Sequence, residues 1–226
     1  MQLSAGMGGG LTYLEVAPPD APADLPLVVA LHGRGASAED LAPLAQAIAA
    51  PWRWVFPNAR LPLDVGGWEG YAWYDLAAPE RDIPPSRRAI EGLLGDLWAR
   101  LGVGPARTAL LGFSQGGVMT LDVGLRAAMR FAGLVVLSGY LALVDGIEAA
   151  LPRATHQRLL IIHGTEDPIV PVGRARATHQ QLVAAGLAPE YHELEMGHEV
   201  TSEVLALVAR FLEAGFALAS GAQHQP

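Results

Sequence analysis

The sequence predicts an α/β protein with a mostly parallel sheet flanked by helices. Short runs rich in Val, Ile and Leu alternate with longer segments of helical period, which is typical of parallel strands joined by crossover helices. With 226 residues, 51 % hydrophobic and 17 % charged, the chain can bury a large core. No repeat, charge block or long linker divides it. We therefore expect one domain over residues 1–226, with flexible ends at 1–10 and 215–226.

Seven segments have the length and composition of strands. They are residues 11–16, 27–31, 53–56, 108–113, 134–137, 159–162 and 191–195. Several are apolar throughout, as strands buried on both faces are.

Helices are predicted between several of these strands. Residues 86–101 carry apolar side chains at helical spacing, with Ser86 as a candidate N-cap after two prolines, and residues 199–214 repeat the pattern as a closing helix. A third helix is predicted over 115–129. Residues 58–85 show no convincing strand or helix, and a loop of that length in a compact domain usually has a function.

Composition excludes several classes of function. The net charge of −8 and the scattered basic residues argue against binding to nucleic acid or to an anionic membrane, and favour a small, neutral substrate. The chain has no cysteine, so disulfides and thiolate chemistry are excluded. The N-terminal residues lack the features of a signal peptide, and no apolar stretch is long enough to span a bilayer. We expect a soluble, cytoplasmic protein without stable membrane insertion. A homodimer is plausible only from the general frequency of two-fold assemblies.

The segment "LLGFSQGGVM" places Ser114 in an apolar run between glycines. Its residues 112–116 fit the G-x-S-x-G nucleophile elbow, in which a strand turns sharply into a helix and exposes the serine. A strand candidate precedes the motif and a helix candidate follows it, as the elbow requires. The alternative is a serine that caps a helix in a nucleotide-binding turn, but the glycine patterns of such turns are absent.

A serine nucleophile needs a base and an acid, which on this type of sheet should follow it in the order acid, then histidine. Asp167 lies in the loop after strand 159–162, and we choose it over the neighbouring Glu166; the alternative for both carboxylates is capping of the next helix. His198 follows the last predicted strand and is the candidate base.

The remaining histidines suggest no catalytic metal. His32 and His163 precede glycines at strand ends and are expected to bond loop backbone, while the others are expected at the surface: His156, His179, His192 and His224. None is paired at metal-ligand spacing, so no catalytic metal is expected.

An oxyanion hole requires preorganised N–H donors. One is the backbone N–H of Gln115, the residue after the serine, and the second should come from the glycine-rich loop after an early strand, where Arg34 is the candidate. The aromatic residues Trp73 and Tyr74 are candidate substrate-binding residues, the alternative being packing of their loop onto the core.

Four separated stretches, "LHGRG" at 31–35, "GFSQGG" at 112–117, "HGTEDPIVP" at 163–171 and "GHEV" at 197–200, resemble the α/β-hydrolase carboxylesterase and phospholipase family that includes the acyl-protein thioesterases. The segment "AWYD" at 72–75 resembles the aromatic motif of that family. The resemblance implies an α/β-hydrolase fold and assigns the nucleophile to Ser114, the acid to Asp167 and the base to His198. It places the oxyanion donors at Arg34 and Gln115 and implies no cofactor.

The resemblance also implies a serine carboxylesterase that hydrolyses short-to-medium acyl esters through an acyl-enzyme, with an acyl-protein thioesterase or lysophospholipase as the alternative. The chain departs from the thioesterases at Arg34, where they usually have an apolar residue, and at Ala36, where they have aspartate. A cation there favours polar or anionic substrates, unless its side chain points to solvent or pairs with a carboxylate. The chain is too short for a large cap domain, so an open site is expected. A non-hydrolytic binding protein and an amide or peptide hydrolase remain competing hypotheses.

Overall fold

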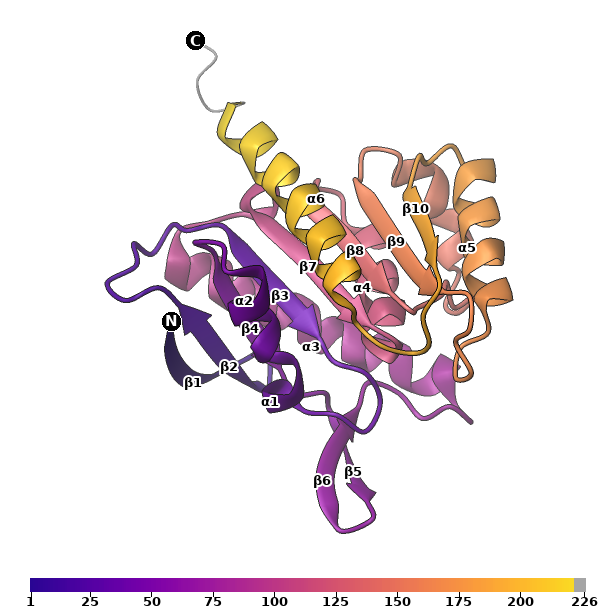
Figure 1. The fold of residues 1–226 in the computed structure, drawn as a ribbon, viewed down its shortest axis with the longest axis horizontal. Coiled ribbons are helices and arrows are strands. Elements are labelled where there is room, and N and C mark those ends of the chain that lie inside the picture. The colour runs from indigo at the N-terminus through magenta and orange to yellow at the C-terminus, as the bar shows by residue number, and fades with distance from the viewer. Residues whose placement is uncertain (222–226) are drawn as a thin grey trace.

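A sheet of eight strands forms the centre of the molecule (Figure 1). The structure, a computed structural model, describes residues 1–221, apart from the side chains at positions 65, 68 and 220. The strand order is β1-β2-β4-β3-β7-β8-β9-β10. The strands are β1 (Gln2–Gly8), β2 (Leu11–Ala17), β3 (Leu27–Leu31), β4 (Arg53–Pro57), β7 (Thr108–Phe113), β8 (Gly133–Leu137), β9 (Leu159–Gly164) and β10 (Glu190–Leu194).

Most of this sheet is parallel, as the sequence predicts. β1 and β2 are antiparallel to their neighbours, and every pairing from β4 to β10 is parallel. All seven predicted strands are present, with bounds that differ by two residues at most. The predicted fold class is therefore confirmed, and no large cap stands over the sheet within residues 1–221.

Helices cover both faces of the sheet (Figure 1). One face packs against α1 (Ala38–Leu41), α2 (Pro43–Ile48) and α6 (Ser202–Gly221), and the other against α3 (Pro79–Leu101), α4 (Gln115–Arg126) and α5 (Val172–Ala184). Short 3₁₀ turns occur at Pro105–Arg107, Ile147–Ala149 and Leu151–Arg153. Successive side chains of a strand enter opposite cores, which is why the central strands are apolar throughout. No helix in the described part of the chain is long and apolar enough to span a membrane.

The N-terminal residues differ from the expectation of a flexible end, because residues 2–8 form β1. Gly9 and Gly10 both have positive φ, 57° and 78°, which is the backbone of a tight two-residue hairpin turn. The Gly9 N–H also donates to Asp96 on α3, at 2.8 Å. The hydrogen bond from Gly9 to Asp96 holds the β1–β2 hairpin against α3.

The C-terminal helix is also longer than predicted. α6 runs through residues 215–221, which the sequence analysis assigns to a flexible end. Phe216 is buried there and packs edge-on against Trp52, with 5.2 Å between the ring centroids. The predicted flexibility of residues 222–226 and the surface position of His224 lie outside the described residues.

Residues 58–85 contain two strands and the start of a helix, so the prediction of a segment without strand or helix is wrong. β5 (Leu61–Val65) and β6 (Trp68–Ala72) form a separate hairpin around Gly66 and Gly67, and this hairpin projects from the body of the molecule (Figure 1). α3 begins at Pro79 instead of Ser86 and includes two prolines. Ser86 is no N-cap: it is buried within the helix, and its hydroxyl donates to the Trp73 carbonyl at 2.5 Å.

Candidate active site

Ser114 occupies the sharp turn between β7 and α4. Its backbone has φ 54° and ψ −115°, a conformation that non-glycine residues rarely adopt and that is found mainly at functional sites. Flanking glycines make the turn possible: a Cβ on Gly112 would lie 2.1 Å from the Gly116 carbonyl oxygen, and a Cβ on Gly116 would lie 2.0 Å from the Leu31 carbonyl oxygen. The strand, turn and helix predicted around the serine are therefore present.

His198 and Asp167 meet beside this turn. Nδ1 of His198 lies 2.7 Å from Oδ2 of Asp167. An ionised carboxylate only accepts hydrogen bonds, so Nδ1 carries the proton and Nε2 is left as the basic nitrogen. The imidazole also packs against Phe113, the residue before the serine, with 4.7 Å between ring centroids. Hydrogen bonds join the two loops, from the N–H of Thr165 to the Leu194 carbonyl and from the N–H of Glu166 to the Met196 carbonyl.

The Asp167 carboxylate is fully buried and strongly hydrogen-bonded. Burial by itself would raise the pKa of Asp167, but the hydrogen bonds from His198 and from the backbone N–H groups of Val170 and Ile169 outweigh it and lower the pKa below its ordinary value. The group is therefore held ionised. Its Oδ1 accepts both backbone bonds, so Asp167 fixes its own loop and does not cap α5, which begins at Val172.

His163 lies behind this pair and was expected to bond loop backbone. Its Nε2 is 2.7 Å from the Val170 carbonyl oxygen, as expected, and also 3.4 Å from Oδ2 of Asp167. A carbonyl can only accept, so Nε2 carries the proton. The contact of His163 with the acid was not predicted, and a second histidine at a strand end was the only signal for it.

Ser114 and His198 border one cavity of about 700 Å³, here called the serine cavity. Gly33 brings the loop after β3 to its rim, since a Cβ on that residue would lie 3.4 Å from Cβ of Ser114. The opposite wall is apolar and comes largely from the α1–α2 segment; the sequence analysis did not identify its residues, which are Leu41, Pro43, Leu44 and Ala47.

The backbone N–H groups of Arg34 and Gln115 have no hydrogen-bond partner within residues 1–221. The next N–H groups along the first loop are used: Gly35 donates to the Tyr71 carbonyl and Ala36 to the Gly33 carbonyl. At Gln115 the N–H belongs to the first turn of α4, where helical N–H groups lack partners and attract negative charge. The two predicted oxyanion donors are thus free to bind a ligand.

The side chain of Gln115 has a role that the sequence analysis missed. Its Oε1 accepts from the backbone N–H of Trp73 at 2.8 Å, and its Nε2 donates to the backbone carbonyl of Tyr74 at 2.7 Å. The aromatic segment is therefore attached to the residue that follows Ser114.

The two aromatic residues predicted to bind substrate lie elsewhere. Trp73 is fully buried in the core and donates from Nε1 to the His32 carbonyl, as the packing alternative expects, and it lines neither the serine cavity nor the cavity beside Tyr74. Tyr74 borders a different cavity, described below.

Arg34 extends its side chain at the mouth of the serine cavity. The residue is exposed, and its guanidinium forms no hydrogen bond or ion pair with any other described residue. Arg34 therefore does not pair with a carboxylate among the described residues, which was one of the two alternatives for its side chain.

The other histidines are placed much as predicted. His32 contacts backbone at both ring nitrogens, the Gly33 carbonyl and the Ala59 N–H. His156, His179 and His192 are partly exposed. Within residues 1–221 no three His, Asp or Glu side chains gather as metal ligands would.

Comparisons with known proteins agree over most of the chain. A model of the phospholipase/carboxylesterase family matches residues 11–215. Acyl-protein thioesterase 1 of Schizosaccharomyces pombe is 33 % identical over 69 % of this chain and 75 % of its own length. Esterase YpfH of Escherichia coli is 30 % identical over 77 % of this chain and 75 % of its own length.

Solved structures show the same architecture. Esterase PE8 superposes with a TM-score of 0.78 at 28 % identity, over 94 % of this chain and 99 % of that one. A carboxylesterase from Mesorhizobium loti superposes with a TM-score of 0.79 over 93 % of this chain and 98 % of that one; at 19 % identity, this second likeness concerns the fold alone.

Proposed function

The chain belongs to the phospholipase/carboxylesterase family of hydrolases, and from that premise we propose that it is a serine carboxylesterase that hydrolyses short-to-medium acyl esters through an acyl-enzyme on Ser114. The observation that carries the proposal is the hydrogen bond of 2.7 Å between His198 and Asp167 at the cavity that Ser114 borders. A buried, ionised carboxylate that fixes the tautomer of a histidine beside a half-buried serine at a cavity is the arrangement that activates a serine hydroxyl.

In the acylation step, Nε2 of His198 takes the proton of the Ser114 hydroxyl while its oxygen attacks the ester carbonyl. Asp167 stabilises the imidazolium that forms, and it stays ionised because its hydrogen bonds lower its pKa. His198 then gives the proton to the departing alcohol, and the acyl group remains on Ser114.

The negative oxygen of the tetrahedral intermediate is assigned to the free N–H groups of Arg34 and Gln115. The loss of one such donor typically costs about 3–4 kcal/mol of transition-state stabilisation. In deacylation His198 acts again as the base, now on water, and the carboxylic acid is released with Ser114 restored.

The serine cavity supports small acyl groups. Its apolar wall, which includes Leu41 and Leu44, suits a short-to-medium hydrocarbon chain, and its volume of about 700 Å³ is in the range of sites for small ligands. Two of the similar proteins are named esterases, which supports an ester as the substrate.

A fluorophosphonate probe tests the proposal because it reacts only with an activated serine. The wild-type protein should be labelled, and Ser114→Ala should not. Ser138→Ala is a matched control: Ser138 also follows a parallel strand and has a positive φ of 50°, but it is completely buried. The control should be labelled like wild type, whereas labelling of the Ser114 variant would refute the assignment.

A thioesterase is the second candidate, favoured by the similarity to an acyl-protein thioesterase over 69 % of the chain. Esters, thioesters, lysophospholipids and amides of matched acyl length separate the possibilities through their kcat/KM values. Highest values for short esters support the carboxylesterase, and highest values for long thioesters support the second candidate. Preference for amides would favour a peptidase, and tight binding without turnover of any member would favour a binding protein.

A further inference from the structure

A second cavity of about 700 Å³ borders the serine cavity, and the two share Leu76. It lies between the start of α3, the loop after β8 and α5. Tyr74 lines it, and the carbonyl of Tyr74 accepts from Gln115, the residue next to Ser114. The second cavity is thus connected to the site of chemistry through its shared wall and through the Gln115 side chain.

The loop that forms one wall, residues 139–146, is held at both ends. At its start, the Leu141 N–H donates to the Thr178 hydroxyl on α5 at 2.8 Å. At its other end, the Arg126 guanidinium donates to the carbonyls of Val144 and Asp145. Because both ends are fixed, the wall is already formed before any ligand binds.

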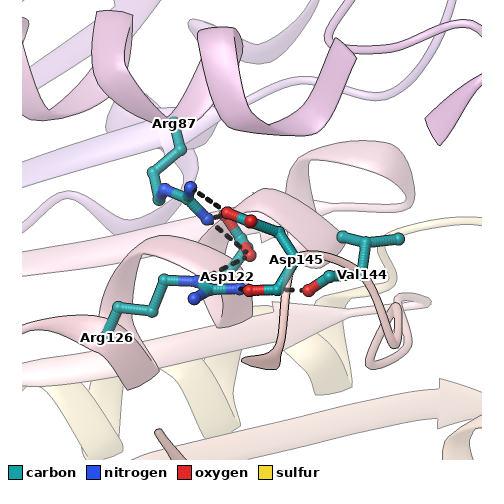
Figure 2. Close-up of polar contacts among 5 residues, drawn as sticks. All are labelled: Arg87, Asp122, Arg126, Val144 and Asp145. Atoms are coloured by element: carbon teal, nitrogen blue, oxygen red, sulfur yellow. Dashed lines mark hydrogen bonds and ion pairs between the residues drawn. The ribbon is translucent and has the colours of Figure 1, made fainter. Parts of the chain in front are cut away.

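Figure 2 shows the ion pairs behind the second of these attachments. Asp122, almost completely buried on α4, pairs with Arg126 on the same helix and with Arg87 on α3, and Arg87 also pairs with Asp145 at 2.5 Å. The two arginines and two aspartates balance in charge. This cluster joins α3 and α4 to the cavity wall without leaving a net charge there.

The polar groups that face the second cavity still have capacity to bind. The hydroxyls of Tyr74 and Tyr140 are 3.2 Å apart and form no hydrogen bond with any other described residue, so one proton forms their mutual hydrogen bond and the other remains available. Burial raises the pKa of Tyr74, Tyr140 adds to this and Arg174 opposes it, so the phenol keeps its proton.

Arg174 brings a positive charge to the same place. Its guanidinium lies over the ring of Tyr140, 3.3 Å from the centroid, and has no carboxylate partner within residues 1–221. Since Arg174 covers this face of Tyr140, that face cannot stack against a cationic ligand. The one carboxylate on the cavity, Glu80, is exposed at the start of α3 and is also without an ion-pair partner among the described residues.

We propose that the second cavity binds an anionic group of the substrate, a carboxylate or phosphate, through Arg174 and the Tyr74–Tyr140 pair while the ester carbonyl lies at Ser114. The inference rests on the proposed function and narrows it to esters or thioesters that carry a negative charge in the acyl or the alcohol part. Arg174 and Tyr140 are then residues that determine specificity and take no part in proton transfer.

The test compares kcat/KM for anionic and neutral substrates of similar shape. For the alcohol part these are 4-carboxyphenyl and 4-carbamoylphenyl butyrate, and for the acyl part monomethyl glutarate and methyl pentanoate. Arg174→Gln should lower the anionic-to-neutral ratio by about tenfold or more in one of the two pairs, since hydrogen bonds to charged groups are strong. The affected pair identifies which half of the ester enters the second cavity.

Two more variants and a control sharpen the result. Tyr140→Phe keeps the ring under Arg174 and removes one hydroxyl, so its ratio should fall by about threefold. If the alcohol pair is the one affected, Arg174→Glu should reverse the preference, so that 3-(trimethylammonio)phenyl butyrate becomes a better substrate than 4-carboxyphenyl butyrate. Arg153→Gln removes an exposed arginine from a different cavity and should leave every ratio unchanged.

A ratio in Arg174→Gln equal to that of wild type for both pairs overturns this inference. The proposed function would survive that result if hydrolysis of the neutral esters still depended on Ser114. The proposed function would instead be refuted if Ser114→Ala still hydrolysed the neutral esters, or if the wild-type protein did not hydrolyse them.

Discussion

At Asp167, burial and hydrogen bonding act in opposite directions. Burial alone would raise the pKa of the carboxyl group, and three hydrogen bonds lower it below its ordinary value. In the unfolded chain the pKa returns to about 3.9. A pKa that is lower in the folded state stabilises the fold above the unfolded value, and this contribution is lost as the pH falls through the folded value.

The Asp167→Asn variant should therefore differ from wild type in a pH-dependent way. Its free energy of unfolding should be lower than that of wild type at pH 6, and the difference should narrow below about pH 4, where the carboxyl group of the unfolded wild-type chain takes up a proton while the folded one is still ionised. Its kcat should fall by about 10³–10⁴, because an amide can hold His198 in the wrong tautomer. Urea unfolding at several pH values and ester hydrolysis measure both effects.

Asp24→Asn is the control, since Asp24 is exposed and its side chain forms no hydrogen bond or ion pair with another described residue. Both the unfolding free energy and kcat of this control should match wild type across the pH range. A constant difference between wild type and Asp167→Asn from pH 6 to pH 3 would contradict the assigned ionisation of Asp167.

Among the elements, the position of α4 requires a very close approach of its first turn to β3. Gly116 lies in this turn, and a Cβ there would be 2.0 Å from the Leu31 carbonyl oxygen, an atom that cannot move without displacing the strand. Gly95 also lies inside a helix, α3, but a Cβ there has open space around it. Both glycines thus lie in helices, but Gly116 is tightly packed and Gly95 has free space beside it.

Gly116→Ala should destabilise the protein by at least about 2 kcal/mol and reduce turnover, because the elbow must shift to accept the methyl group. Gly95→Ala should stabilise it by up to about 1 kcal/mol, the difference in helix propensity. Denaturant unfolding of both variants measures whether each substitution raises or lowers the free energy of unfolding. Equal effects would show that the contact with Leu31 does not limit the turn.

Elements whose side chains face a core were predictable from the sequence, and elements made by backbone turns were not. The central strands follow from their apolar runs. Both missed hairpins turn on paired glycines with positive φ, Gly9 and Gly10 in one and Gly66 and Gly67 in the other. The start of α3 was missed because Pro84 and Pro85 argue against a helix, while the complete burial of Ile83 and Ser86 holds that turn in place.

At the scale of the whole molecule, the order serine, acid, histidine along the chain was enough to propose a site. Parallel strands bring their carboxyl ends to the same edge of the sheet, so residues that follow different strands meet there. Ser114, Asp167 and His198 each follow a strand, so a prediction from order alone placed them together. Trp73 and the side chain of Gln115 could not be assigned this way, since their contacts depend on how a long segment folds back over the nucleophile turn. The second cavity likewise arises from three elements distant in sequence.

The C-terminal helix closes this assembly and offers a test of where the folded domain ends. Phe216→Ala should lower the free energy of unfolding by about 3 kcal/mol, because it empties a buried contact with Trp52. Leu218, two residues further on and 58 % exposed, should tolerate alanine with a change below about 0.5 kcal/mol. A flexible end would make the two substitutions equally harmless.

The β5–β6 hairpin touches the rim of the serine cavity through few contacts. The backbone N–H of Tyr71 on β6 donates to the Ala36 carbonyl, and its carbonyl accepts from the Gly35 N–H. Gly70 approaches the Gly35 carbonyl so closely that no larger residue fits. The hairpin pairs with no strand of the central sheet. Changes at its base, where β6 meets residues 35 and 36, would therefore be felt at the cavity, whereas insertions at its projecting tip would leave both the core and the cavity lining as they are, so the hairpin can gain length without cost to the site.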